Sequence, residues 1–570
     1  MVASSEGTDV ASKEEGTVTP TGPVSDRLSP PWTRGRRNAL AALITAVILI
    51  VFSASQIGVD PQRLIDGWQD LGNLLGRMLP IELPEPARVV GPVLDTLMIA
   101  VAGTALAVLL SLPLAFLAAS NTTPSRPVRA VARAIILGAR AIPDLVYALI
   151  FVRVLGVGVL PGVLAVAVYS TGMIGKLFAE AIEEIDPGIH QAVEVVGAGR
   201  LQAVVTGVVP QVMPSFVATV LYRLDMNVAA SAVLGFVGAG GIGFELYNTL
   251  RTLQYQRGLG LALIIIALVI LVERTSAAIR ASIVGNEQAR RHRRIRSRPT
   301  IKRTVVPHSE RRLSAPWTRA RIMRAITAGI AALLVAVSFM GLDISPLALV
   351  QAVPELLTSV SSFFPPDFAS VQEQLPRSIM ETLTIAIMVT ALATLLSLPV
   401  AFLAARTIAP HPIIYHVARL IIVVARGLPP LVLALIFVSA FGLGPFAGVV
   451  ALSLGSIGLT AKLMADAVEH IDPGPGTALR STGATRTQQS VTAVIPQVAP
   501  SFVATVLFTL DSTIRSSTIV GIVGAGGVGF ITYQSVHTLQ FHTTTAVLIV
   551  IFVTVFIVER FSDAVRKRIL

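Results

Sequence analysis

The sequence predicts an all-α membrane protein with about twelve transmembrane helices, arranged as two tandem six-helix repeats. Of the 570 residues, 53% are hydrophobic and only 14% are charged. Apolar runs of roughly 20 residues recur along the chain, which is the length that a helix needs to cross the hydrocarbon core of a bilayer. A β-barrel is not expected, because its strands are about 10 residues long and alternate in polarity. The two halves of the chain also match almost without gaps.

The repeat is clearest in a polar stretch that begins at Asp186 and returns at Asp472, 286 residues later. Both copies end in Pro-Gln-Val-x-Pro-Ser-Phe-Val-Ala-Thr-Val-Leu. Because six spans is an even number, the repeats share one topology and are related by an axis along the membrane normal. The expected spans are 39–58, 89–119, 131–155, 160–182, 206–236 and 258–280, and then 321–342, 377–405, 419–441, 446–468, 492–522 and 543–561.

The polar segments between the spans predict four parts and one orientation. The parts are a disordered tail (1–38), a first six-helix domain (39–280), a basic linker (281–320) and a second six-helix domain (321–570). Arginines gather in the loops after the second, fourth and sixth spans and at the end of the chain. The positive-inside rule therefore places both termini, the linker and the two polar stretches in the cytoplasm. The loops at 59–88 and 343–376 are expected outside, as short surface helices that meet a partner.

Composition excludes several classes of function. The chain has no cysteine, and its eight histidines show no metal-ligand spacing, so we expect no disulfide, no thiolate chemistry and no metal site. We also expect no catalytic residue in this chain. The net charge of +12 lies in loops, where topology explains it better than nucleic-acid binding. No GxxxxGK[ST] motif occurs, so any ATP and Mg²⁺ must bind a separate subunit.

Each polar stretch predicts a short helix. Asp186 followed by proline is a good helix start, and Gly197 is expected to end a helix over 189–197. The second copy carries two glycines and a second proline in its first turn, so its helix is expected to start near Thr477. The glycine and the next proline are 13 residues apart in both copies, at Gly197 and Pro210 and at Gly483 and Pro496.

This spacing resembles the EAA loop of ABC importer permeases. The Glu-Ala-Ala positions are occupied by Gln191-Ala192-Val193 and by Thr477-Ala478-Leu479, so the leading glutamate is absent from both copies. In that family the segment is the coupling helix that docks in a groove of the ATPase subunit. The alternative is a loop helix without a partner. The resemblance implies an ATPase-coupling set of Asp186, Gln191, Ala192, Gly197, Pro210, Asp472, Thr477, Ala478, Gly483 and Pro496.

A glycine-rich loop follows the fifth span of each half and lies at its outer end. Its glycines either expose backbone N–H groups to an anion or let helices approach closely. Intramembrane charges are the second candidate for a pathway, since an arginine at a helix centre costs about 2.5–3.5 kcal/mol and needs a reason. They form either a cationic route for an oxyanion or structural ion pairs. The candidate residues are Gly238, Gly240, Gly241, Gly243, Gly524, Gly526, Gly527 and Gly529, with Arg140, Arg426, Asp225 and Asp511.

Together these motifs resemble the phosphonate/phosphate (PhnE-type) branch of the ABC importer permeases, over about 89–280 and 377–561. The resemblance implies the type I (MetI-like) fold, two ATPase copies, an extracytoplasmic binding protein and location in a bacterial plasma membrane. It implies ATP-driven import of phosphate, a phosphonate or a related oxyanion such as phosphite by alternating access. The alternatives are a permease for an amino acid or a quaternary amine, an ion-driven secondary transporter, and a scaffold that binds nucleic acid through the linker.

Overall fold

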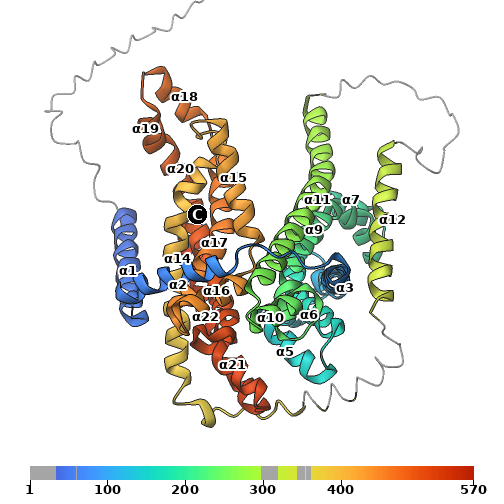
Figure 1. Ribbon diagram of the computed structural model, residues 1–570. Helices are drawn as coiled ribbons and strands as arrows, with labels where there is room; N and C mark the ends of the chain where they lie inside the picture. The colour runs from blue at the N-terminus through green and yellow to red at the C-terminus, as the bar shows by residue number, and fades with distance from the viewer. Residues whose placement is uncertain are drawn as a thin grey trace, which may run out of the picture. The chain divides into compact units, whose positions relative to one another are not determined.

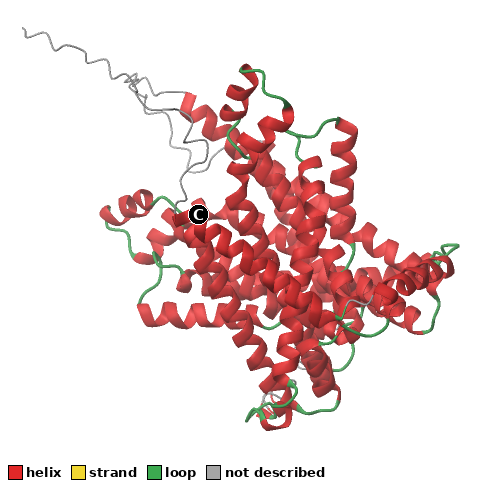
Figure 2. Cartoon of the chain, turned by 90° about the vertical axis from the view of Figure 1, so that its left-hand side faces the viewer, coloured by secondary structure: helices red, strands yellow, loops and turns green. Residues whose placement is uncertain are grey.

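The computed structural model describes residues 34–58, 61–296, 319–342 and 361–569, with 354 and 358. These residues form helices and loops and contain no strand (Figure 2). The chain divides into two compact units, Met1–Val51 and Phe52–Leu570. Most of the predicted tail and residues 297–318 of the predicted linker lie outside the described residues. Residues 281–296 of that linker instead continue the helix that precedes it.

The helices of the first repeat follow the expected spans (Figure 1). They are α1 (Arg34–Ile57), α2 (Pro61–Arg77), α3 (Pro86–Ala118), α4 (Arg126–Ala141), α5 (Asp144–Leu155), α6 (Val159–Glu183), α7 (Pro187–Val195), α8 (Arg200–Ala203), η2 (Val204–Val208), α9 (Val209–Leu234), η3 (Gly235–Val237), α10 (Gly241–Arg251) and α11 (Tyr255–Arg296). The segment 59–88, which is expected outside, does form a surface helix, α2, with a strongly one-sided apolar pattern.

The second repeat reproduces this order, with many element bounds shifted by the same 286 residues. Its elements are α12 (Arg319–Met340), η4 (Ala369–Val371), α14 (Leu375–Leu403), α15 (Pro412–Gly427), α16 (Pro430–Phe441), α17 (Pro445–Glu469), α18 (Gly474–Ser481), α19 (Arg486–Gln489), η5 (Ser490–Val494), α20 (Ile495–Val520), η6 (Gly521–Ala525), α21 (Gly527–His537) and α22 (Phe541–Ile569). The repeat seen in the sequence is therefore a repeat of structure.

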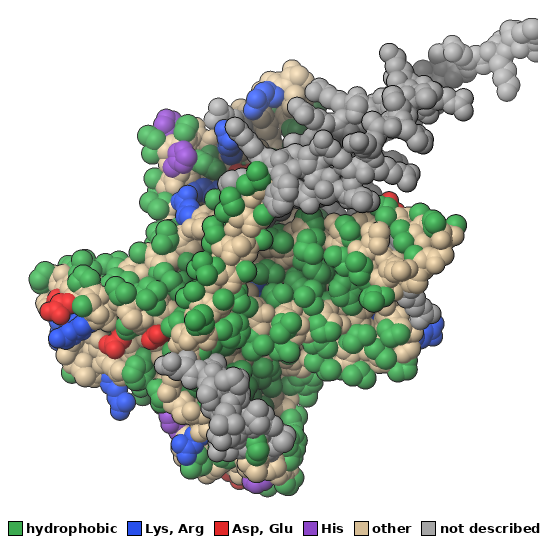
Figure 3. All heavy atoms as spheres, turned by 90° about the vertical axis from the view of Figure 1, so that its right-hand side faces the viewer, with side chains coloured by type: hydrophobic (Ala, Val, Ile, Leu, Met, Phe, Trp, Pro, Cys, Tyr) green, Lys and Arg blue, Asp and Glu red, His purple; other side chains and the backbone are tan. Residues whose placement is uncertain are grey.

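Among the described residues, nine helices are long and apolar enough to cross a membrane. Two further pairs of helices are bent, and counting each pair as one span gives up to eleven spans. The remaining expected span, 321–342, corresponds to α12, whose apolar part, Ala325–Met340, is shorter. All twelve expected segments are thus helical. Hydrophobic side chains cover the middle of the face in Figure 3, while charged side chains gather toward its edges. A surface of this kind suits a lipid environment.

The third span of each repeat is not one helix but two, bent by 84°. The bends fall at Ile142-Pro143 and at Leu428-Pro429. Proline disfavours the helical conformation of the residue before it, and both Ile142 (ψ 128°) and Leu428 (ψ 111°) are extended. Pro113 and Pro399, which also interrupt apolar runs, lie inside continuous helices instead.

The two repeats are interlocked rather than merely adjacent. The first helix of the second repeat, α12, packs on α3 of the first repeat, and α2 of the first packs on α16 of the second. The helices α11 and α15 meet across the repeats, as do α22 and α4. One large core cluster joins Leu145 and Leu234 of the first repeat to Leu431 and Ile522 of the second. The two repeats therefore share a core within the second unit.

Candidate functional site

The predicted helix starts at Asp186 and Asp472 are present in both copies. The Gly188 N–H donates to Oδ1 of Asp186, and the Gly474 N–H donates to Oδ1 of Asp472, each at 2.9 Å. The first helix, α7, begins at Pro187, two residues before the expected start. The expected start of the second near Thr477 is wrong, because α18 begins at Gly474. Pro475 lies in the first turn, where a missing N–H breaks no hydrogen bond within the helix.

The predicted helix ends are also matched. Gly197 and Gly483 have φ of +88° and +82°, which glycine adopts without strain. The Ala198 N–H then donates to the Val193 carbonyl, and the Ala484 N–H to the Leu479 carbonyl. A Cβ at either glycine would meet no atom within 4 Å, so conformation alone requires glycine there.

The proline that follows each of these glycines by 13 residues lies at the start of the next span. Pro210 is the second residue of α9, and Pro496 is the second residue of α20. A single-turn π-helix, η2 or η5, precedes each of them. These π-helices, of five residues each, were not predicted from the sequence.

The two loop helices are largely unburied. No residue of α18 is buried, and Ala192 and Ala478 are both exposed. Val195, which ends α7, and Val196 just after it are each 87% exposed, and Leu201 is 78% exposed. Such a cluster of exposed apolar side chains is typical of a surface that a partner covers.

The glycine-rich loops are close-packed turns. A Cβ on Gly243 would lie 1.7 Å from the carbonyl oxygen of Ala232, and one on Gly529 would lie 2.0 Å from that of Thr518. Gly238, Gly240 and Gly241, with their counterparts Gly524, Gly526 and Gly527, have positive φ.

Several N–H groups of these loops already donate within the protein. The Ile242 N–H donates to Oγ1 of Thr96 and the Val528 N–H to Oγ1 of Thr382, both at 2.9 Å. The Gly527 N–H donates to the carboxylate of Glu381. Of the two interpretations of these loops, close helix packing has the geometric support.

The matched intramembrane arginines form reciprocal ion pairs between the repeats. The Arg140 guanidinium donates to the carboxylate of Glu559 on α22, and Arg426 donates to Glu273 on α11. All four side chains are more than four-fifths buried. The ammonium nitrogen of Lys176 also lies 3.9 Å from Glu559. Each repeat thus supplies the cation to one pair and the anion to the other.

The matched aspartates are paired as well, by different partners. Asp511 accepts two hydrogen bonds from Arg515, one turn away on α20. Asp225 instead accepts from Arg280 at 2.9 Å, a residue near the end of the sixth span that the sequence analysis did not consider. A role for Arg140, Arg426 and these aspartates in the pathway stays a prediction.

A cavity of about 1220 Å³ lies between the repeats. The bent helices α5 and α16, the glycine-rich loops and the helices α10 and α21 all contribute to its lining. Among the predicted pathway residues, Gly238, Gly524 and Gly526 line it, whereas Arg140, Arg426, Asp225 and Asp511 do not. The sequence analysis did not predict the polar residues that α10 and α21 contribute to this lining. A signal was present, because Phe244 and Tyr247 recur 286 residues later as Phe530 and Tyr533.

A family model described as "Binding-protein-dependent transport system inner membrane component" matches the chain twice, at residues 111–283 and 397–570. The chain belongs to this family, the membrane-spanning permease subunits of ABC importers, and carries two permease domains in tandem. It is therefore a transport subunit of the membrane and not an enzyme. The predicted permease fold is confirmed.

Within the family the chain is of the PhnE type. It is 44% identical over 519 residues to the phosphate-import permease protein PhnE of Mycolicibacterium smegmatis, covering 91% of this chain and 93% of the relative. It is 41% identical to the phosphite transport system permease protein PtxC of Stutzerimonas stutzeri, over 43% of this chain and 89% of that one. A solved structure of the MetNI methionine ABC transporter, in an inward-facing form, matches 35% of this chain and 99% of its own, with 24% identity and a TM-score of 0.33.

Proposed function

We propose that this chain imports phosphate, a phosphonate or a related phosphorus oxyanion such as phosphite, driven by two ATPase subunits that bind α7 and α18. The names of its relatives support the substrate class, since they are described as permeases for phosphate, phosphite and phosphonate transport. The observation that carries the coupling role is the pair of exposed, matched loop helices. Relatives named for methionine transport are less similar, at 29–30% identity.

The mechanism follows from the position of the coupling helices. ATP-driven closure of the two ATPase subunits would move α7 and α18 together, and the reciprocal ion pairs would carry that movement between the repeats. The pathway would open outward, where a binding protein delivers its ligand. This mechanism requires that α7 and α18 lie in the cytoplasm, where the ATPase subunits are. We propose that both termini lie on the same side.

Substrate and coupling are tested by one reconstitution. The chain is placed in proteoliposomes with its ATPase and binding protein, and ATP hydrolysis is measured with phosphate, phosphite, methylphosphonate, methionine and glycine betaine. Stimulation by at least one phosphorus oxyanion and by neither organic solute is expected. Stimulation by methionine or glycine betaine alone would refute the substrate class and leave the permease assignment intact.

The orientation is tested with single cysteines, because the chain has none of its own. Ser481→Cys on α18 and Thr252→Cys after α10 are both at exposed positions. In intact cells we expect a membrane-impermeant maleimide to label Cys at 252, and to label Cys at 481 only after permeabilisation. Labelling in the reverse order would place the loop helices outside and reject the coupling role.

The coupling role predicts that charge on the loop helices uncouples transport. Ala192→Asp and Ala478→Asp put a carboxylate on an exposed helix face, so the chain should remain folded. Each is expected to lower substrate-stimulated ATP hydrolysis about tenfold or more, the size of effect seen at the centre of protein interfaces. Thr407→Asp, exposed in the loop after α14, is the control and should leave coupling unchanged. Comparing the two single variants also measures whether the two helices contribute equally.

A further inference from the structure

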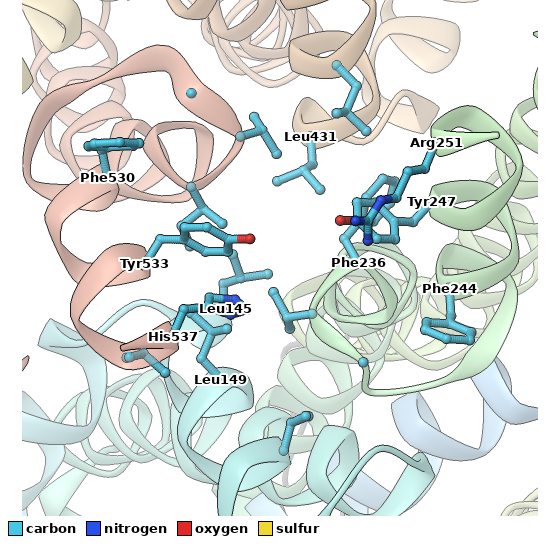
Figure 4. Close-up of a pocket in the computed structure, with 18 of the residues that line it drawn as sticks. Leu145, Leu149, Phe236, Phe244, Tyr247, Arg251, Leu431, Phe530, Tyr533 and His537 are labelled. Carbon is cyan, nitrogen blue, oxygen red and sulfur yellow. The ribbon is translucent and has the colours of Figure 1, made fainter. Parts of the chain in front are cut away.

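The cavity between the repeats has a polar wall that the pathway prediction did not include. Helix α10 supplies Tyr247 and Arg251 to this wall, and α21 supplies Tyr533 and His537 (Figure 4). The two residues on each helix are four positions apart and so lie on one face. Figure 4 shows the two helices on opposite sides of the cavity, with the phenol of Tyr533 directed toward Tyr247 and Arg251.

The charge of the lining is of one sign. Arg153 and Arg251 line the cavity, and no aspartate or glutamate is among the described residues that do so. A cavity with apolar walls and cationic groups concentrates anions, because the low-dielectric walls strengthen the field. The guanidinium group in particular presents N–H donors in a planar fork that matches a phosphoryl group.

Neighbouring rings orient the two tyrosines. Tyr247 makes an edge contact with Phe236 at 5.8 Å between ring centroids, and the Tyr533 ring lies 4.1 Å from that of His537. Burial, and then the Tyr247 phenol, raise the pKa of Tyr533, while the charge of Arg251 lowers it. A tyrosine is protonated at neutral pH even without this rise in pKa, so the O–H of Tyr533 is available as a donor.

The cavity is asymmetric although its helices are related by the repeat. Arg251 in the first repeat corresponds to His537 in the second, and Arg153 corresponds to Ser439. Both arginines therefore belong to the first repeat. A ligand that pairs with guanidinium groups would lie nearer the first repeat than the second.

We propose that this cavity binds one tetrahedral phosphorus oxyanion, held by Arg251 and by the phenol groups of Tyr247 and Tyr533 on the first-repeat side of the axis. The proposal rests on the proposed function and names the residues that select its substrate class. Arg153 adds a second cation, and the glycine-rich loops shape the walls. The site lies away from the Arg140 and Arg426 ion pairs, whose charges are already satisfied.

The test measures binding to the permease itself, apart from the binding protein. The full chain in lipid nanodiscs is titrated with inorganic phosphate and, separately, with phosphite, and binding is read from broadening of the ³¹P resonance. Arg251→Gln is expected to weaken binding at least about tenfold, as for loss of a charge-assisted hydrogen bond. Tyr533→Phe should weaken it a few fold. Arg77→Gln, an exposed arginine on α2 that does not line the cavity, is the matched control.

An exchange separates a binding role from a structural one. Arg251→His is expected to weaken binding, and adding His537→Arg returns one guanidinium to the equivalent position on the other repeat. The double variant should recover at least half of the binding free energy that Arg251→His loses. A purely structural Arg251 would not be rescued in this way.

Two outcomes would overturn the site. These are phosphate binding by Arg251→Gln at wild-type affinity, and equal weakening by Arg77→Gln. Reconstituted uptake keeps the two proposals apart. A wild-type complex that imports phosphate, together with an Arg251→Gln complex that imports and binds it equally well, rejects the site alone. A wild-type complex that imports no phosphorus oxyanion rejects the proposed function.

Discussion

Arg426→Glu is expected to destabilise the chain strongly and to abolish transport, and adding Glu273→Arg is expected to restore much of both. The wild-type pair joins α15 of the second repeat to α11 of the first, with both side chains mostly buried. Removing one partner of a buried pair costs about 3–5 kcal/mol, since the other charge is left uncompensated. Reversal places two carboxylates together and is expected to cost at least that much. Thermal unfolding in detergent and uptake in proteoliposomes measure the two effects.

The chain contains its own matched comparison. Arg140→Glu with and without Glu559→Arg should give the same pattern, because the second pair is the repeat-related copy of the first. Arg88→Glu changes an exposed pair with Glu85 and should shift stability by no more than about 1 kcal/mol. Failure of both double variants to recover any stability would show that these charges do not act mainly through each other.

Gly243→Ala carries the second large expected effect. The added methyl group would lie 1.7 Å from the Ala232 carbonyl oxygen, which belongs to the backbone of α9 and has no flexible side chain to move. Overpacking of this kind costs about 1–3 kcal/mol even where neighbours adjust, so α10 is expected to shift away from α9. Because α10 carries Tyr247 and Arg251, weaker phosphate binding should accompany a lower unfolding temperature.

A helical glycine without neighbours provides the control. Gly138 lies inside α4, and a Cβ there would meet nothing within 4 Å. Gly138→Ala should leave the unfolding temperature unchanged or raise it slightly, since alanine is the better helix former by about 1 kcal/mol. If Gly243→Ala behaved like Gly138→Ala, close packing would not be the reason for glycine in this loop.

Much of the fold follows from the sequence because membrane helices are long and apolar, and charged loops separate them. The twelve expected segments are all helical, and the repeat spacing persists in the structure. The 84° bends were only partly predictable. Pro143 and Pro429 indicate a kink, but its size depends on how far the preceding residue leaves the helical region. The start of α18 was mispredicted because glycine and proline were counted as helix breakers in a turn where proline is tolerated.

The candidate sites were harder to predict, because pairing across the repeats is not visible in sequence spacing. Arg140 and Glu559 are 419 residues apart, and nothing local indicates that they meet. The constant offset of 286 residues did recover matched positions such as Arg140 with Arg426 and Asp225 with Asp511. It missed Arg251 and His537, because a search for matched residues overlooks positions at which the two repeats differ.

The reciprocal pairing also constrains how the protein is made. Arg140 enters the membrane early in synthesis, but its partner Glu559 lies near the end of the chain, on the last helix, α22. This ion pair between the repeats therefore cannot form until Glu559 on α22 has been synthesised, 419 residues after Arg140. A chain that stops before α22 lacks Glu559, so the Arg140 guanidinium has no carboxylate to pair with there.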